Sequence, residues 1–288
     1  MKDFTPSRRN LLAAAPFLAL ASAVRAQDTG ETPYRFGETP EEAERIAIDA
    51  HEDLMDLPDL YMHGNETIAM LAYPGMTVLD LIGPQYMFAS MMGASVQVVS
   101  ADKSLAPIVS DTKVAIVPDV HFDDSPEELD ILFVPGGTSG TVAAMRDPAT
   151  MEFLRGRAPK AKLVTAVCTG SLILGQAGLL EGKRATCHWA ARHLLPEFGA
   201  TPVNARVVED GNLVTGGGVT AGIDFGLSIL ARLRGESYAK VVQLQAEYAP
   251  APPFDSGTPE AAGPAITEPM QAMFATFLHD VRATARTR

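Results

Sequence analysis

The chain has 288 residues, of which 47% are hydrophobic and 20% are charged, and its formal net charge at pH 7 is −12. This composition is typical of a globular protein that buries a substantial core in one domain of ordinary size or in two small ones. The acidic balance excludes the basic footprint of proteins that bind nucleic acid or anionic membranes.

Residues 1–26 have the pattern of an export signal. Arg8 and Arg9 precede an apolar run over 11–24, and small residues follow at Val24-Arg25-Ala26, with Ala21-Ser22-Ala23 as a competing cleavage site. The paired arginines predict the twin-arginine route to the periplasm. A Sec signal or an uncleaved anchor is the alternative, although the run is shorter than the roughly 20 residues of a membrane span. Cleavage would remove four basic residues and one acidic residue, change the charge to −15 and leave no membrane span.

Residues 27–64 are polar and acidic, with Glu41, Glu42 and Glu44 leading into a weakly helical stretch. We expect an N-terminal tether with one or two short helices, and the sequence indicates no function for it.

Strand and helix patterns alternate from residue 65 to residue 248, which we take as the catalytic domain. We expect strands over 67–73, 95–100, 130–134, 162–167 and 184–188, and hairpins over 107–120 and 206–215. Helices should run over 79–92, 141–157 with a break near Pro148, 220–234 and 237–247, and a helix should follow each of Cys168 and His188. Continuous apolar strands between helices predict an α/β fold with a mainly parallel sheet covered on both faces. Ligands of such sheets bind beyond the carboxyl ends of the strands, which places 73–75, 135–137, 168–169 and 216–217 on one rim.

The segment around Cys168 is the most informative. A run rich in β-branched residues stops at this cysteine and is followed by Thr169, Gly170 and a helical pattern. A strand that turns into a helix at a nucleophile is the elbow of α/β hydrolytic enzymes, and the strained corner requires small neighbours such as Ala166 and Gly170. The helix N-terminus should lower the pKa of the thiol and favour the thiolate.

Two structural alternatives remain for this cysteine. Cys168 could be an inert buried thiol, or it could form a disulfide with Cys187, the other cysteine of the chain, in an oxidising compartment. No group of His, Cys, Asp and Glu residues has the spacing of a metal site, so we expect no metal.

Asp80, in the sequence Leu79-Asp80-Leu81, is the candidate proton donor and acceptor. Its apolar neighbours should raise the pKa of the carboxyl, which suits proton transfer beside a thiol. The alternative is that Asp80 caps the N-terminus of the helix that begins there.

Four further residues are candidates for the substrate pocket. The amides of Gly136 and Gly137, with the amide of Thr169, could stabilise charge on the substrate, although the glycines could simply form a turn and Thr169 could cap its helix. His188 ends the next sheet element, where it is either a site imidazole or a core residue packed beside Trp189. Gly217 lies on the same rim. The run Gly216–Gly218 is too short for a dinucleotide fingerprint, so we expect no nicotinamide cofactor.

The C-terminal region, residues 249–288, begins with a Pro-rich extended segment. A helix with an apolar stripe should follow, and the stripe should cover the core or a dimer partner. Its members are Ile266, Met270, Met273, Phe274, Phe277, Leu278 and Val281.

Four segments together resemble the ThiJ/PfpI superfamily: LDLIGP (79–84), VPGG (134–137), the elbow segment over 166–190 and VTGGGVTAGIDF (214–225). Within it, VVQLQAEYAPAPPFDSGTPEAA (241–262) is similar to the isonitrile hydratase group. The likeness covers roughly residues 66–262 and implies the flavodoxin-like, class I glutamine amidotransferase-like three-layer fold, and a homodimer.

The resemblance implies a cofactor-free hydration of an isonitrile to an N-substituted formamide through a thioimidate on Cys168. Asp80 would work beside the nucleophile, and the amide and hydroxyl of Thr169 would line the pocket. Peptidase-like members of the superfamily carry His directly after the cysteine, so Thr169 makes a Cys-His protease a poor fit.

Other superfamily activities stay open from the sequence. One is a glyoxalase or deglycase that uses the same thiol on an aldehyde. Another is a non-catalytic ligand-sensing or redox-sensing domain. The regulator form of that domain would carry a DNA-binding region, which the acidic charge disfavours.

Overall fold

The computed structural model describes residues 37–286, and its centre is a seven-stranded sheet with strand order β10-β11-β7-β6-β1-β2-β5. Only the β10–β11 pair is antiparallel. The strands are β1 (Thr67–Leu71), β2 (Ser95–Ser100), β5 (Val120–His121), β6 (Leu129–Val134), β7 (Ala161–Val167), β10 (Val207–Asp210) and β11 (Leu213–Gly216). The predicted α/β fold with a mainly parallel sheet is confirmed.

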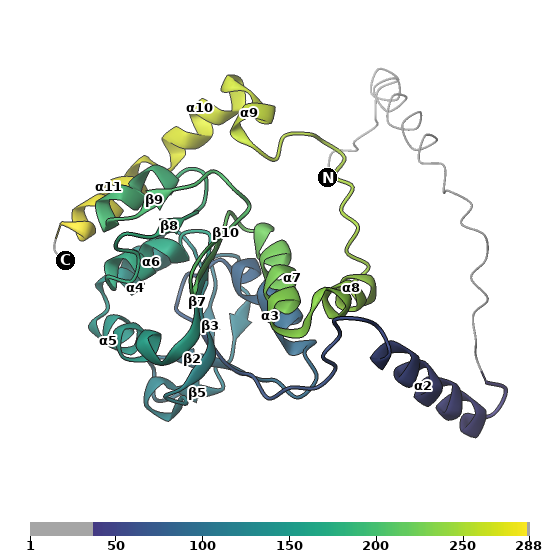
Figure 1. Ribbon diagram of the computed structural model, residues 1–288. Helices are drawn as coiled ribbons and strands as arrows, with labels where there is room; N and C mark the ends of the chain where they lie inside the picture. Colours follow the sequence, from purple (N-terminus) through teal and green to yellow (C-terminus); the bar gives the residue numbers. More distant parts are fainter. Residues whose placement is uncertain (1–36, 287–288) are drawn as a thin grey trace, which may run out of the picture. The chain divides into compact units, whose positions relative to one another are not determined.

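Helices cover both faces of this sheet. Figure 1 shows α3 and α7 on one side and α4, α5 and α6 on the other. The bounds of these helices are α3 (Val78–Ala89), α4 (Ser139–Arg146), α5 (Pro148–Arg157), α6 (Gly170–Gln176) and α7 (Ala221–Arg234). A further helix, α8 (Glu236–Gln245), follows α7. The predicted break of the 141–157 helix at Pro148 is confirmed, because Pro148 begins α5 and Asp147 caps it.

Aromatic side chains of α3, β6 and α7 form the centre of the core. The Phe88 ring lies 6.0 Å from Phe133 and 6.3 Å from Phe225, and all three side chains are fully buried. This contact fixes α3 and α7 against the sheet. The first residues of α3 and the loop before α7 are thereby held at the carboxyl ends of the strands.

Two predicted strand segments lie outside the central sheet. β3 (Ile108–Val109) and β4 (Ala115–Ile116) form a separate hairpin, and only β5 joins the sheet edge. β8 (Arg184–Ala185) pairs with β9 (Thr201–Pro202), so the expected strand over 184–188 is wrong beyond Ala185. The 3-10 helices are η1 (Phe122–Asp124), η2 (Ala158–Lys160) and η3 (Arg192–Phe198).

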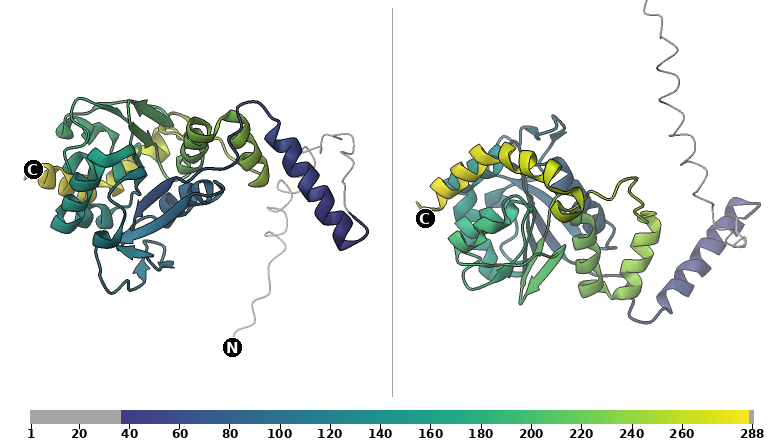
Figure 2. Two further views of the ribbon diagram at one scale, coloured as in Figure 1. Left: turned by 60° about the horizontal axis from the view of Figure 1, so that its bottom comes forward. Right: turned by 90° about the horizontal axis from the view of Figure 1, so that it is seen from above.

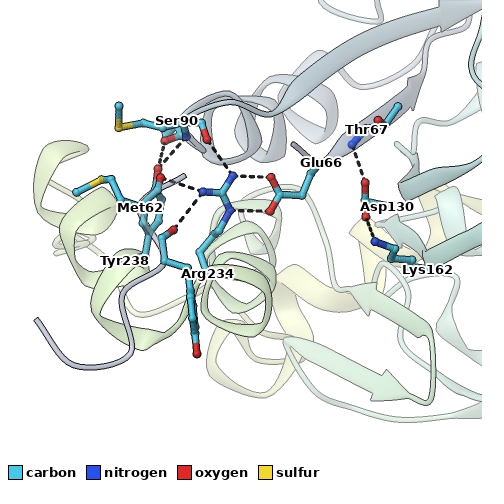
Figure 3. Close-up of polar contacts among 10 residues, drawn as sticks. Met62, Glu66, Thr67, Ser90, Asp130, Lys162, Arg234 and Tyr238 are labelled. Atoms are coloured by element: carbon cyan, nitrogen blue, oxygen red, sulfur yellow. Dashed lines mark hydrogen bonds and ion pairs between the residues drawn. The ribbon is translucent and has the colours of Figure 1, made fainter. Parts of the chain in front are cut away.

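A buried arginine connects the ends of several elements (Figure 3). Arg234, at the end of α7, pairs with Glu66 through Nε and Nη2, and its remaining N–H groups donate to the carbonyls of Tyr61, Met62 and Met92. All five donors of the guanidinium are therefore used. In the same view, Asp130 accepts from the Thr67 amide at 2.8 Å and pairs with Lys162 at 2.6 Å, which joins the N-terminal ends of β1, β6 and β7.

The N-terminal helix α2 (Pro40–Met55) has no buried residue and accounts for part of the predicted tether. The export signal predicted over 1–26 lies outside the described residues. None of the helices within 37–286 is long and apolar enough to cross a membrane.

The C-terminal region folds as three short helices rather than one, α9 (Pro259–Ala262), α10 (Pro264–Met273) and α11 (Ala275–Ala285). They follow the Pro-rich segment as a band on the domain (Figure 2). The predicted apolar stripe is split, since Phe277 and Val281 of α11 are buried whereas Met270 and Met273 of α10 are 40% and 77% exposed. Gly263, at φ +74, ends α9, and Phe274 lies between α10 and α11.

Candidate active site

Cys168 lies at the corner between β7 and α6 with φ 57, a left-handed conformation that a non-glycine residue adopts only under strain. Its amide donates to the carbonyls of Gly216, at 3.0 Å, and Gly217, at 2.8 Å. A side chain at Gly170 would collide with the Val134 carbonyl oxygen, which explains the glycine two residues after the cysteine. The elbow predicted from the sequence is present.

Asp80 is the third residue of α3 and is fully buried. The N-cap position belongs to Thr77, so the capping alternative is wrong. Oδ2 of Asp80 accepts from the Gly136 amide at 3.1 Å, and Oδ1 has no hydrogen-bond partner among residues 37–286. Burial raises the pKa of Asp80 to about 7, against the lowering effects of the Cys168 thiol and the Gly136 amide. The raised pKa predicted from the sequence is confirmed.

The pKa of the Cys168 thiol differs from the prediction. Burial raises its pKa well above the ordinary value, and the charges of Asp80 and Cys187 raise it further. Backbone amides of Val219 and Thr169 lower the pKa of Cys168, but their effect is smaller than the loss of solvation. The thiolate expected in the resting protein is therefore wrong. The pair rests instead as a thiol beside a carboxyl group that titrates near neutral pH.

The amides of Gly136 and Gly137 do not face an open pocket as predicted. The Gly136 amide binds Asp80, and the Gly137 amide donates to Oγ1 of Thr169 at 2.8 Å. A Cβ atom on Gly136 would lie 2.6 Å from the Thr169 nitrogen and 2.7 Å from Oδ2 of Asp80. Glycine is required here because Asp80 and Thr169 approach the backbone so closely.

The hydroxyl of Thr169 also forms hydrogen bonds to the protein backbone and does not face a substrate pocket. Oγ1 donates to the Gly137 carbonyl at 2.6 Å while it accepts from the Gly137 amide, and it makes no cap hydrogen bond to α6. The expectations that this hydroxyl lines the pocket or caps the helix are wrong. What Thr169 presents to the sulfur is its amide.

Three residues of the site were not predicted from the sequence. Oη of Tyr73 lies 2.9 Å from the Pro135 carbonyl oxygen and 3.2 Å from Oγ1 of Thr141, which lies 3.0 Å from Oγ1 of Thr169. Burial raises the pKa of Tyr73 well above its ordinary value, so this phenol stays protonated and fixes the Pro135–Gly137 turn. The third is Val219, at φ 21, whose amide reaches Cys168. Its position directly after the glycine run was the available signal.

His188 and Gly217 line one cavity beside the elbow. Gly217 accepts from the Cys168 amide and donates to the Arg206 carbonyl at 2.9 Å. His188 is half-buried, and its imidazole is not hydrogen-bonded to Cys168 within the described part of the chain. It is brought to the site by the loop after β8 and not, as predicted, by a strand of the central sheet. Burial lowers the pKa of His188, so the ring is neutral at pH 7.

Both cysteines are free and buried, and burial raises the pKa of Cys187 to about 12. The disulfide alternative is therefore not the state that the structure describes. Among residues 37–286, no group of three or more His, Cys, Asp and Glu residues is placed to hold a metal ion.

Residues 66–232 match the sequence profile of the DJ-1/PfpI family. The chain belongs to this family. The match spans the central sheet and contains the elbow, Asp80 and Thr169. The resemblance that the sequence motifs indicated, and the flavodoxin-like α/β fold that it implied, are thereby confirmed.

Individual relatives within the family are similar to this chain to different degrees. The chain is 51% identical to an isonitrile hydratase of Pseudomonas putida over 201 residues, which are 70% of this chain and 86% of that one. It is similar to the crystal structure of a ThiJ/PfpI family protein from Pseudomonas syringae, with 50% identity, a TM-score of 0.77 and coverage of 80% and 96% of the two chains. A glutathione-independent glyoxalase of Caenorhabditis elegans is 28% identical over 50% of this chain and 77% of that one.

Proposed function

We propose that this DJ-1/PfpI protein hydrates an isonitrile, R–N≡C, to an N-substituted formamide, with Cys168 as nucleophile and Asp80 as proton carrier. The observation that carries the proposal is the buried contact between the two. A carboxyl with a pKa of about 7 lies against the thiol, and its Oδ1 has no hydrogen-bond partner in the described part of the chain. The relative named an isonitrile hydratase supports the reaction class.

In the first step the Asp80 carboxylate accepts the thiol proton while Sγ of Cys168 forms a bond to the isonitrile carbon. Asp80 then gives the same proton to that carbon, which yields the thioimidate R–N=CH–S–Cys168. A carboxyl group with a pKa near the working pH can both accept and donate, which is the condition for efficient proton transfer.

In the second step Asp80 accepts a proton from water, whose oxygen adds to the thioimidate carbon, and returns the proton to nitrogen. The adduct R–NH–CH(OH)–S–Cys168 then loses its C–S bond. The hydroxyl proton passes through Asp80 to the departing sulfur, and R–NH–CHO is released. One water molecule is consumed, and both side chains end in their starting state.

The amides of Thr169 and Val219 support the sulfur through both steps. Each lowers the pKa of Cys168, so each stabilises negative charge that develops at Sγ as the proton leaves. We assign Gly136 and Gly137 the positioning of Asp80 and Thr169, and His188 and Gly217 the wall of the substrate pocket.

The direct test offers the purified protein a panel of alkyl isonitriles and methylglyoxal. We expect loss of the infrared N≡C stretch and release of the formamide, with no lactate from methylglyoxal. Lactate without formamide would contradict the proposal and favour the glyoxalase reading. Neither product, with ready oxidation of Cys168, would favour a sensing domain.

We also propose that the protein is a homodimer. One face of α3 exposes Leu79, Ile82 and Tyr86 by 40–42%, and the hairpin beside it exposes Val109 and Val114 by 45–48%. Light scattering should give twice the chain mass, and Ile82→Glu should give a monomer. Leu244→Glu, at a residue that is 81% exposed, is the matched control and should leave the mass unchanged. A wild-type monomer would contradict the proposal.

The third proposal concerns location. We propose that Arg8 and Arg9 direct the folded protein to the periplasm by the twin-arginine route. Replacement of both by lysine should leave the protein in the cytoplasmic fraction, and unchanged export would contradict the proposal.

A further inference from the structure

A cavity of about 400 Å³ lies beside the elbow. Its walls come from residues 187–189, 192, 204–206 and 217–221, and from the C-terminal segment 257–260. Chain segments far apart in sequence therefore enclose one space.

This cavity adjoins the reactive sulfur. Val219, whose amide reaches Sγ of Cys168, lines it. Cys187 also lines it, and its proximity raises the pKa of the same thiol. Gly217 lines it as well and accepts from the Cys168 amide at 2.8 Å. If the isonitrile carbon sits at Sγ, the cavity is the space into which its R group extends.

Two arginines line the cavity, and they differ in their partners. Arg206 is paired with Asp224 and also contacts Thr220. The side chain of Arg192 is half-buried and has no hydrogen bond or ion pair with any residue of 37–286. The positive charge of Arg192 nevertheless acts on other residues of the cavity wall, because it lowers the pKa of both His188 and Cys187. A half-buried guanidinium without a partner is a ready site for a planar anion.

The other side chains that line the cavity do not compete with Arg192 for binding of a planar anion. The His188 ring is neutral at pH 7 and packs at a tilt against Phe274, with 5.5 Å between the ring centroids. Phe274 also lies 6.3 Å from Trp189. Of these rings, those of His188 and Trp189 line the cavity and offer an apolar wall. Glu260 is the one carboxylate among the described lining residues, and its side chain is exposed on the C-terminal segment.

We propose that Arg192 binds a carboxylate on the R group, so that the substrates are isonitriles that carry a carboxylate at the far end of an apolar chain. The inference rests on the proposed hydratase function. A single guanidinium fork matches a single planar carboxylate, and the wall formed by His188 and Trp189 suits the carbon chain between the two ends.

The test compares a series of ω-isocyano carboxylates of two to six carbons with the methyl ester of each. For at least one chain length, kcat/KM should favour the carboxylate by roughly 10- to 100-fold, as expected for a charge-assisted pair. The chain length with the largest preference reports how far Arg192 lies from Sγ.

Variants test whether the preference for carboxylate over ester substrates depends on Arg192. Arg192→Gln should reduce the carboxylate-to-ester ratio to about one, with the loss in KM rather than kcat because the pair forms equally in the ground and transition states. Arg192→Lys should restore part of the ratio, since it keeps the charge without the fork. Arg184→Gln, at an exposed arginine that does not line the cavity, is the matched control and should keep the full ratio.

The outcomes separate the inference from the function on which it rests. Hydration of esters and carboxylates at similar kcat/KM, or a preference that survives in Arg192→Gln, overturns the inference alone. Absence of hydration for every isonitrile overturns both.

Discussion

The carboxyl group of Asp80 and the thiol of Cys168 meet in the protein interior, although one lies in the first turn of α3 and the other directly follows β7. Each affects the pKa of the other: the thiol lowers that of Asp80, and the carboxylate raises that of Cys168. Both side chains are almost completely buried, so solvent does little to screen this coupling. The consequences can be measured.

The pH dependence of catalysis should follow Asp80. We expect kcat/KM for a neutral isonitrile to rise as the pH increases through about 7, because the ionised carboxyl must accept the thiol proton. The charge of Asp111 raises the pKa of Asp80, so Asp111→Asn should move the inflection to lower pH. The exposed Asp124→Asn serves as control and should not move it. A profile that is flat from pH 5 to 8 would contradict this role of Asp80.

Stability should also depend on Asp80. The folded protein holds a proton on this group up to about pH 7, whereas the unfolded chain releases it near 3.8. The native state therefore binds more protons in that window, and the free energy of unfolding falls as the pH rises through it. Asp80→Asn keeps an acceptor for the Gly136 amide but cannot ionise. In urea unfolding experiments, the free energy of unfolding of the variant relative to the wild type should increase by on the order of a few kcal/mol from pH 4.5 to pH 7.5. An equal difference at the two pH values would contradict the assignment.

Gly136 should tolerate no side chain. Gly136→Ala would force a methyl group against the Thr169 amide and Oδ2 of Asp80, so activity should fall by at least about ten-fold and stability by about 1–3 kcal/mol. Gly156→Ala is the matched control, because a Cβ atom there would have no neighbour within 4 Å among the residues that the structure describes, and the residue lies in α5. It should stabilise the protein by about 0.5–1 kcal/mol without loss of activity. Two variants of equal activity would show that the close approach at Gly136 is unimportant.

Two neighbouring arginines should differ sharply in unfolding experiments. Arg234→Gln breaks the buried pair with Glu66 and leaves carbonyls unsatisfied, so it should cost about 3–5 kcal/mol. Arg232→Gln removes a partly exposed pair with Glu209 and should cost no more than about 1 kcal/mol. Similar costs would show that the bonds of Arg234 drawn in Figure 3 do not stabilise the domain.

Periodicity and turn chemistry were enough to predict the central sheet, the elbow and the rim. The hairpin over 206–215 and the break at Pro148 were local signals, and the structure has both. The raised pKa of Asp80 followed from its apolar neighbours. These features depend on residues close together in sequence.

What the sequence did not predict depends on long-range contacts. The hydroxyl of Thr169 is taken up by Gly137 and Thr141, which lie on other elements. The thiol pKa rises rather than falls because burial outweighs two amides, and burial was not available from the motif. Val219 reaches the sulfur with its amide from a loop at φ 21, a backbone conformation that the sequence pattern does not reveal.

The central claim is that Cys168 and Asp80 together add water to an isonitrile. The most direct measurement is kcat/KM on one neutral alkyl isonitrile for the wild type, Cys168→Ala, Asp80→Asn and the control Asp124→Asn. We predict that the first two variants lose more than about 100-fold while the control stays within about two-fold of the wild type. Hydration by Cys168→Ala or Asp80→Asn at a rate close to that of the wild type would contradict the claim.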